Sequence, residues 1–395
     1  MILTILIFLL ILSVLVLIHE AGHFFVAKFF GIKVEEFGFG FPPKAFSIRR
    51  GETEYSINWL PIGGFVKLYG EDEAGGGQIK VHNSKFKIHN SELNRAFFAR
   101  PVWQRGLVVV AGVVMNIFLA AFIFYIFLGM SGFMVEIPLL SPHTFVGVNQ
   151  KDYNLNREDV VVSMVAKNSP AEKAGMQGPL LIGAVNGKTI TDRTSFIKIV
   201  DANKGKALRL DWIDLKTGKK MTSIVTPRLN PPEGEGSMGV GFFPISILRY
   251  ETFSQKLFSG FSHTANITTY TVSIMSKLVG LSVAQRNAGP LSESVSGPIG
   301  IGVLVGEILQ LPTLKEKVMG ALNLAGLLSV SLAFFNILPI PALDGGRLFF
   351  ILFEGVFGKK INQKHENLAH TIGMVVLLGL IILITFRDIF RFLIP

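Results

Sequence analysis

An uncharged apolar run, Met1 through Ile18, opens the sequence and constrains the fold more than any other stretch. A run of this length covers about 27 Å as an α-helix, close to the thickness of the hydrocarbon core of a bilayer. It has neither a basic start nor a small-residue cleavage site. We therefore expect a retained transmembrane helix over residues 1–30 rather than a signal peptide.

The run ends in the segment His19-Glu20-Ala21-Gly22-His23. At helical spacing His19 and His23 lie on one face about one turn apart, which provides half of a tetrahedral zinc site. Glu20 beside them is a candidate general base. Ionisable groups in a membrane-length segment are costly and usually functional, which favours catalysis. The alternative is a histidine pair that contacts lipid headgroups at a helix end.

Composition agrees with a polytopic membrane protein, since 49% of the 395 residues are hydrophobic and the mean hydropathy is +0.48. The net charge of +10 is scattered along the chain rather than blocked, which favours cytoplasmic loops and headgroup contacts over nucleic acid. The absence of cysteine excludes disulfides, thiolate ligands and a cysteine nucleophile. Any metal site must therefore use histidine and carboxylate ligands.

Asp344 is the best candidate for a third zinc ligand. It follows an apolar segment that Pro339 and Pro341 interrupt, and its placement in the membrane would otherwise be costly. The alternative role is a cap at a helix start. We expect about four transmembrane helices, the later three covering residues 106–130, 318–346 and 368–395, with a cytoplasmic loop at 347–367.

Residues 31–105 combine strands and turns with a polar cytoplasmic loop. Alternating residues in Lys44–Ile48 and Tyr55–Trp59, around a turn at Arg49-Arg50-Gly51, predict a β-hairpin. Glycines at 38, 40, 63 and 64 would permit close backbone approach. The hairpin could dip into the membrane against protein or form a small soluble element, and the sequence leaves both open.

Residues 142–228 predict a small soluble α+β domain. A capped helix covers Ser169–Gly175, and the strand Leu180–Val185 is closed by the turn Asn186-Gly187. Residues 229–317 then read as a linker and amphipathic helices. Within them, Phe253–Leu281 is too polar for a clean span and is expected at the membrane interface or packed on other helices.

The basic residues predict the orientation in the membrane. None precedes the first span, many lie between the first and second, and Arg347, Lys359, Lys360 and Lys364 lie between the third and fourth. Both of these stretches are therefore expected in the cytoplasm, and the 142–228 domain and both termini outside. His19, His23 and Asp344 then share one depth near the cytoplasmic side.

These motifs together resemble the site-2 protease family of intramembrane zinc metalloproteases, and most closely its RseP-like bacterial branch. His19-Glu20-x-x-His23 matches the family's first motif, and the segment from Asn336 to Gly346 matches its second. Gly38–Gly40 and Pro61–Val66 resemble the family's glycine loop and membrane-associated β-hairpin. Residues 169–175 and 185–187 resemble a PDZ domain. Gly297–Ile301 resembles a motif ahead of the third span.

The resemblance implies hydrolysis of peptide bonds within transmembrane segments, with Glu20 as general base. It implies one Zn²⁺ per chain, held by His19, His23 and Asp344. Substrate binding is expected to involve seven residues, some implied by the resemblance and some assigned from the hairpin pattern, namely Asn336, Gly38, Gly40, Gly63, Gly64, Tyr55 and Ile57. The implied location is the bacterial inner membrane, and the implied substrates are single-pass proteins such as anti-sigma factors or remnant signal peptides. Pre-cleaved remnants could meet the extracytoplasmic PDZ domain.

The sequence departs from the family in places. A single PDZ domain is expected where well-known relatives have two. Gly112–Asn116 lacks the proline of the usual pattern. The alternative for Asn116 is the ordinary role of a hydrogen bond to a neighbouring helix. A catalytically silent PDZ scaffold would not need Glu20, and a metal transporter would need more intramembrane ligands or a repeat. The remaining histidines are expected at the surface, namely His82, His89, His143, His263, His365 and His370.

Overall fold

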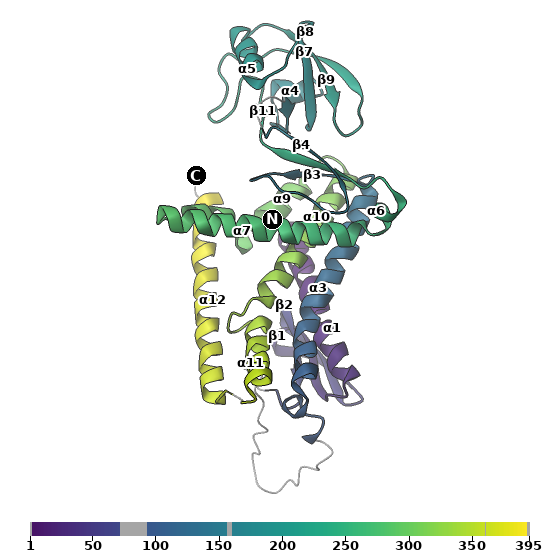
Figure 1. The fold of residues 1–395 in the computed structure, drawn as a ribbon, viewed down its shortest axis with the longest axis vertical. Coiled ribbons are helices and arrows are strands. Elements are labelled where there is room, and N and C mark those ends of the chain that lie inside the picture. Colours follow the sequence, from purple (N-terminus) through teal and green to yellow (C-terminus); the bar gives the residue numbers. More distant parts are fainter. Residues whose placement is uncertain (1, 72–92, 156–159, 360, 393–395) are drawn as a thin grey trace. The chain divides into compact units, whose positions relative to one another are not determined.

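The computed structural model describes residues 2–71, 93–155, 160–359 and 361–392, which form two compact units (Figure 1). One unit comprises Met1–Phe127 and His263–Pro395, and the other comprises Leu128–Ser262. Residues 72–92, which belong to the predicted cytoplasmic loop and include His82 and His89, lie outside the described residues.

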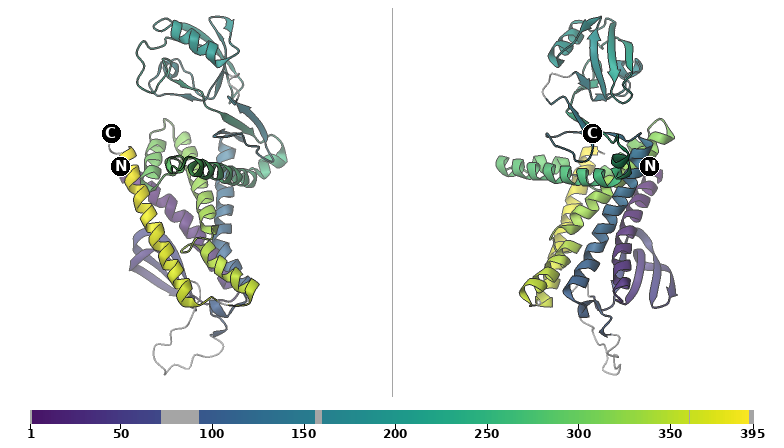
Figure 2. Two further views of the ribbon diagram at one scale, coloured as in Figure 1. Left: turned by 60° about the vertical axis from the view of Figure 1, so that its left-hand side comes forward. Right: turned by 45° about the vertical axis from the view of Figure 1, so that its right-hand side comes forward.

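Five helices among the described residues are long and apolar enough to cross a membrane. They are α1 (Ile2–Phe29), α3 (Val102–Met130), α7 (Ser259–Gln285), α10 (Leu314–Ile337) and α12 (Gln363–Phe392). Figures 1 and 2 show α7 running across the other four, which are steeply inclined to it. The chain is thus a polytopic helical membrane protein, and α7 is the helix whose direction differs.

The chain breaks between α10 and a new helix, α11 (Asp344–Phe357). The expected break at Pro339 and Pro341 is therefore present, but the expected loop at 347–367 is not a loop throughout, because α11 continues to Phe357. Pro339 and Pro341 cannot continue the α10 hydrogen-bond ladder, so α10 ends at Ile337. Gly345 lets α11 start close to that end, since any Cβ there would overlap the carbonyl oxygens of residues 337 and 338.

The Gly297–Ile301 motif is a docking point for α12. It starts α9 (Pro298–Leu309), which follows the short α8 (Gly289–Ser294). The fully buried Asp388 of α12 accepts hydrogen bonds from the backbone N–H groups of Gly297 and Gly300, at 2.8 and 3.0 Å. The carboxylate thus caps two otherwise unpaired donors at the start of α9.

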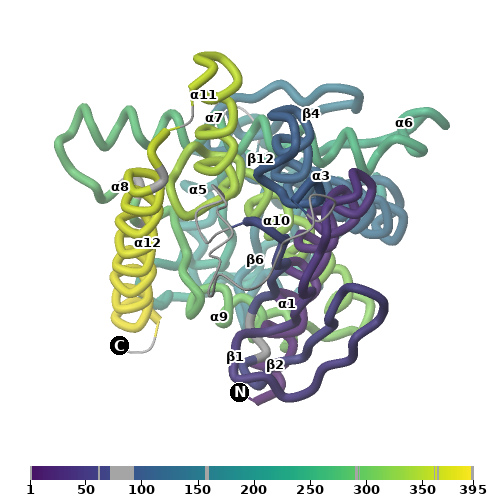
Figure 3. The backbone as a smooth tube through the Cα atoms, turned by 90° about the horizontal axis from the view of Figure 1, so that it is seen from below, coloured from purple at the N-terminus to yellow at the C-terminus, as the bar shows by residue number. Residues whose placement is uncertain are grey.

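The predicted hairpin is present as β1 (Val34–Arg50) and β2 (Thr53–Leu68), beside α1 (Figure 3). Its turn contains Gly51 at a φ of 65°. Residues 36–39 pair with 64–67 and also with 54–57, whereas 44–50 pair with 53–58. The two strands therefore fold into a sheet in which 54–57 is paired on both sides and 64–68 forms an edge. Gly64 of this edge segment lies against α1, beside Val16 and Glu20.

The described residues of the second unit form three sheets. The elements of the first are β3 (Met134–Pro138), β12 (Ile245–Arg249) and β4 (Asn149–Tyr153), in that order. The second runs β10 (Lys220–Val225), β9 (Leu208–Asp214), β7 (Leu180–Val185), β5 (Val161–Val162), with β8 (Lys188–Thr189) paired to β7. The third pairs β11 (Val240–Gly241) with β6 (Met164–Val165). The helices are α4 (Pro170–Lys173), α5 (Arg193–Ala202) and α6 (Phe253–Leu257).

The expected domain limits of 142–228 are displaced at both ends. β4 lies inside them but pairs with β12, whereas β11 lies beyond them and pairs with β6. The apolar core of the α+β fold extends from Val160 to Met238. The sequence misleads here because β4 is polar, and because the Pro- and Gly-rich segment 230–236 is a loop that returns to the domain instead of a linker that leaves it.

Candidate active site

Three side chains converge on one point between α1, α3 and α11. His19 Nε2 lies 2.9 Å from Asp344 Oδ2, and His23 Nε2 lies 3.2 Å from the same oxygen. The two Nε2 atoms are 3.2 Å apart. Among the described residues, these three form the one group of histidine and acidic side chains placed to share a metal ion. The structure thus brings together the three predicted ligands, which are 325 residues apart at the extremes.

One face of α3 supports both histidines. The Nδ1–H of His23 donates to the carbonyl oxygen of Val108 at 2.8 Å, and His19 Nδ1 lies 3.0 Å from the side-chain nitrogen of Asn116. Between them is Gly112, where a Cβ would come within 2.7 Å of His19 Cε1 and even closer to His23. The rings occupy the space that a side chain at 112 would fill. The sequence signal for these contacts is the spacing Gly-x-x-x-Asn, but the sequence alone does not say which side chains Gly112 and Asn116 meet.

Asn336, the predicted substrate-holding residue, also reaches this point from α10. Its side-chain nitrogen lies 3.4 Å from His19 Nε2. Asp344 is the first residue of α11, and Ala342 precedes it in the left-handed region with a φ of 80°. The backbone N–H of Ala342 donates to His370 Nδ1 at 2.9 Å, which fixes the loop just before the ligand.

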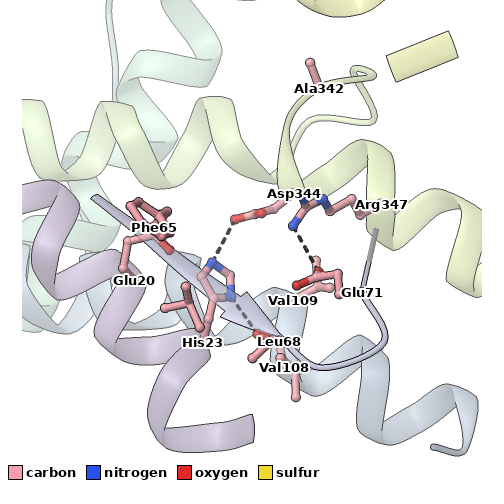
Figure 4. A pocket seen from close by; sticks show the side chains of 11 residues that line it. Glu20, His23, Phe65, Leu68, Glu71, Val108, Val109, Ala342, Asp344 and Arg347 are labelled. Carbon is pink, nitrogen blue, oxygen red and sulfur yellow. Dashed lines mark hydrogen bonds and ion pairs between the residues drawn. The ribbon is translucent and has the colours of Figure 1, made fainter. Parts of the chain in front are cut away.

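A pocket of about 200 Å³ opens beside the three ligands (Figure 4). Glu20 and Phe65 lie at one side of it, with His23 and Asp344 in the middle. Opposite them Arg347 and Glu71 form an ion pair of 3.2 Å. Glu20 therefore faces the same space as the ligands, where a general base must be.

The β1–β2 hairpin reaches this pocket through its edge segment, residues 64–68. Phe65, Val66 and Leu68 line the pocket. A Cβ added at Gly64 would come within 3.5 Å of Glu20 Cγ. Of the predicted hairpin glycines, Gly64 therefore lies close to Glu20.

The other predicted hairpin residues lie elsewhere in the sheet. Gly38 makes room for the Phe65 ring, while Gly40 and Gly63 take φ values of 80° at the corners of the sheet. Tyr55 packs its ring against Phe24 and Phe37, and Ile57 is 53% exposed. Neither residue lines the pocket, and their segment already pairs on both sides.

The expectation that the remaining histidines are surface residues is wrong for two of them. His263 and His370 are 1% and 7% exposed. His263 packs against the ring of Phe124, and His370 accepts from the Ala342 N–H described above. His365 is exposed as expected, and His143 is half-buried. The sequence around a histidine in an amphipathic helix does not reveal whether another helix covers that face.

The ligand geometry fits zinc. Two imidazole nitrogens and one carboxylate oxygen form a three-ligand set whose remaining side opens to a pocket, which is the arrangement of catalytic rather than structural zinc sites. Outer bonds on ring nitrogens, such as the one from His23 to Val108, are also typical of metal-binding histidines.

Comparison with known proteins decides the family. The sequence matches the peptidase family M50 over residues 7–380. The chain belongs to peptidase family M50. A Clostridium perfringens protein that carries a zinc metalloprotease name is 32% identical, over 95% of this chain and 96% of its own. The zinc metalloprotease RasP of Bacillus licheniformis is 29% identical over 98% and 99%, and the regulator of sigma-W protease RasP of Bacillus subtilis is 27% identical over 98% of each chain.

This M50 member is therefore a zinc metalloprotease of the site-2 type and a multi-pass membrane protein. The catalytically silent scaffold is not favoured, because the Glu20 of the first motif is present and borders the pocket.

Proposed function

We propose that this M50 protease hydrolyses peptide bonds inside the transmembrane segments of single-pass membrane proteins, with one zinc ion per chain. The observation that supports this most is the convergence of His19, His23 and Asp344 beside a pocket, with both histidines inside a helix long enough to span a membrane and Asp344 shortly after the end of another. Ionisable groups at such a depth are retained for function.

Bound zinc would polarise the scissile carbonyl and lower the pKa of water. Glu20 takes the proton of the attacking water and passes it to the leaving amine. The side-chain nitrogen of Asn336 lies 3.4 Å from His19 Nε2 and is therefore at the site. From there the amide donates a hydrogen bond to the substrate backbone. Val108 and Gly112 of α3 hold the imidazoles in place.

A transmembrane helix protects its peptide bonds by its own hydrogen bonds, so the substrate must be held extended. We propose that it adds as a strand along residues 64–68, the sheet edge that borders the pocket. This replaces the earlier placement on Tyr55 and Ile57, whose backbone is already paired on both sides. Gly64 allows the extended substrate to approach Glu20 closely.

We propose four membrane spans, with α7 lying along a membrane surface as its crosswise direction suggests. The hairpin enters the membrane, because Phe41, Phe46 and Trp59 are each at least half exposed and would otherwise face water. The host membrane is the bacterial inner membrane, with the catalytic residues near its cytoplasmic side.

Cysteine labelling tests this orientation in a chain that has no cysteine. Single cysteines replace Lys206, in the α+β domain, and Lys359, after α11, both of which are exposed. A membrane-impermeant thiol reagent added to intact spheroplasts should label the protein at 206 and spare the one at 359 until the membrane is opened. Labelling at 359 in intact spheroplasts would contradict the orientation.

We further propose that the fold between Val160 and Gly241 is a single PDZ domain outside the cytoplasm, which excludes substrates with bulky outer domains. Its small helix α4, capped by Ser169, and the strand β7 with the Asn186-Gly187 turn support this identification. Pre-cleaved remnants, including anti-sigma factor stubs and leftover signal peptides, would pass. The sigma-W regulator among the relatives supports the anti-sigma class.

Excision of residues 160–241 tests the filter, because the β3-β12-β4 sheet keeps all its strands. The chemistry should persist, and a substrate with a large outer domain should be cleaved about as fast as one with a short stub. The readout is the ratio of the two cleavage rates in cells. If the shortened enzyme discriminates as the full chain does, the filter lies elsewhere. Proteomics of small membrane proteins that accumulate in cells with Glu20→Gln identifies the substrates themselves.

A further inference from the structure

Asn116 touches one of the proposed zinc ligands, and the proposed chemistry gives it no role. It is fully buried in α3, and its side-chain nitrogen lies 3.0 Å from His19 Nδ1. Its side-chain oxygen is also buried and has no hydrogen-bond partner. An unpaired buried amide oxygen is costly, so its placement beside a metal ligand requires an explanation.

The chemistry of imidazole settles which end of the amide His19 requires. Its Nε2 is the atom that converges with Asp344 and His23, and a ring nitrogen that binds a metal carries no proton. The single proton of neutral His19 then resides on Nδ1, which becomes a donor. An amide –NH₂ group cannot accept that hydrogen bond, whereas the amide oxygen can.

A half turn about the Cβ–Cγ bond of Asn116 exchanges its oxygen and nitrogen, which are nearly equal in size. The oxygen then occupies the position 3.0 Å from Nδ1 that the nitrogen now holds. We propose that Asn116 is a positioning residue whose side-chain oxygen accepts the Nδ1–H of His19 and so fixes the tautomer that binds zinc. The inference rests on the proposed zinc site.

The arrangement on α3 supports this role. Val108, Gly112 and Asn116 are four residues apart and share one helix face, as the His19 and His23 rings do on α1. Val108 accepts from His23 through its backbone, Gly112 leaves room for both rings, and Asn116 faces His19. The spacing Gly-x-x-x-Asn thus matches two imidazoles one helical turn apart, whose planes meet at 82°. A helix-bonding asparagine would not need a glycine one turn before it.

Two substitutions separate an accepting role from a donating one. Asn116→Leu removes both atoms and should weaken zinc binding about 10- to 100-fold, the usual effect of losing an outer partner of a metal-bound histidine. Asn116→Asp keeps an acceptor but has no N–H, so it should bind zinc as tightly as the wild type or more tightly. If the amide N–H were the functional group, the aspartate variant would be as weak as the leucine variant.

The measurement is zinc affinity of the purified full chain in detergent, by competition with a chromophoric chelator. Ser329→Ala is the matched control, since the Ser329 hydroxyl donates to the backbone oxygen of Asn116 at 2.8 Å at the same helix contact. It should change thermal stability and leave zinc affinity unchanged. If Asn116→Leu does not yield folded protein, Asn116→Ala takes its place in the comparison.

Wild-type affinity in the leucine or alanine variant, or equal weakness of the aspartate variant, would overturn the inference. A wild-type chain that binds no zinc would instead overturn the proposed function, so the two failures are distinguishable.

Discussion

Glu20→Gln should abolish cleavage and leave zinc content unchanged. The substitution removes the carboxylate that takes a proton from water but keeps the shape of the side chain, and Glu20 itself is not one of the three converging ligands. General acid–base catalysis contributes about 10²- to 10⁴-fold, so cleavage should fall by at least about a hundredfold, which is roughly 2.7 kcal/mol in the barrier. The measurements are turnover of a single-pass substrate in detergent and metal content of the same preparation.

Glu71→Gln is the matched control for Glu20. Glu71 lines the same pocket from the opposite side, where it pairs with Arg347. Its loss should change turnover far less than the loss of Glu20. A Glu20→Gln enzyme with normal turnover would contradict the assignment of the general base, and one without zinc would show that Glu20 also holds the metal.

Asp344→Ala should lose zinc and, with it, all cleavage. The variant leaves two imidazole ligands, whereas catalytic zinc sites use three protein ligands. Metal analysis of the purified chain should fall from about one zinc per chain to a small fraction.

Glu354→Gln provides the control on the same helix. Glu354 forms a partly buried ion pair with Arg105 at 2.7 Å, so its loss should lower thermal stability while zinc content stays normal. Full zinc retention in Asp344→Ala would reject Asp344 as a ligand and with it the proposed site.

The convergence of the candidate site residues could be predicted from the sequence, because ionisable groups in apolar segments are rare and their spacing follows helix geometry. The four-residue spacing of the two histidines was enough to single out His19, Glu20 and His23. Asp344 was singled out by the two prolines before it and by its expected depth in the membrane. The hairpin was predicted from alternation and a glycine turn. These signals are local, and the structure shows the three side chains together and the hairpin formed.

The rest depends on which surfaces meet, and no local pattern encodes that. Tyr55 and Ile57 alternate as an edge strand would, but residues 36–39 pair beside them. The end of α10 follows from its two prolines, whereas the helix α11 that covers 347–357 was expected to be a loop. The partner of Asn116 is almost a hundred residues away in the chain, and Gly112 has its role only against the two imidazoles.

The position of the cut tests the central claim most directly. Purified enzyme and a single-pass substrate are placed together in lipid vesicles, and mass spectrometry identifies the new termini, with Glu20→Gln as the blank. The account predicts zinc-dependent cleavage between residues inside the apolar segment, towards its cytoplasmic end, and none in the blank. Cleavage confined to the soluble part of the substrate, or equal cleavage by the Glu20→Gln enzyme, would contradict it.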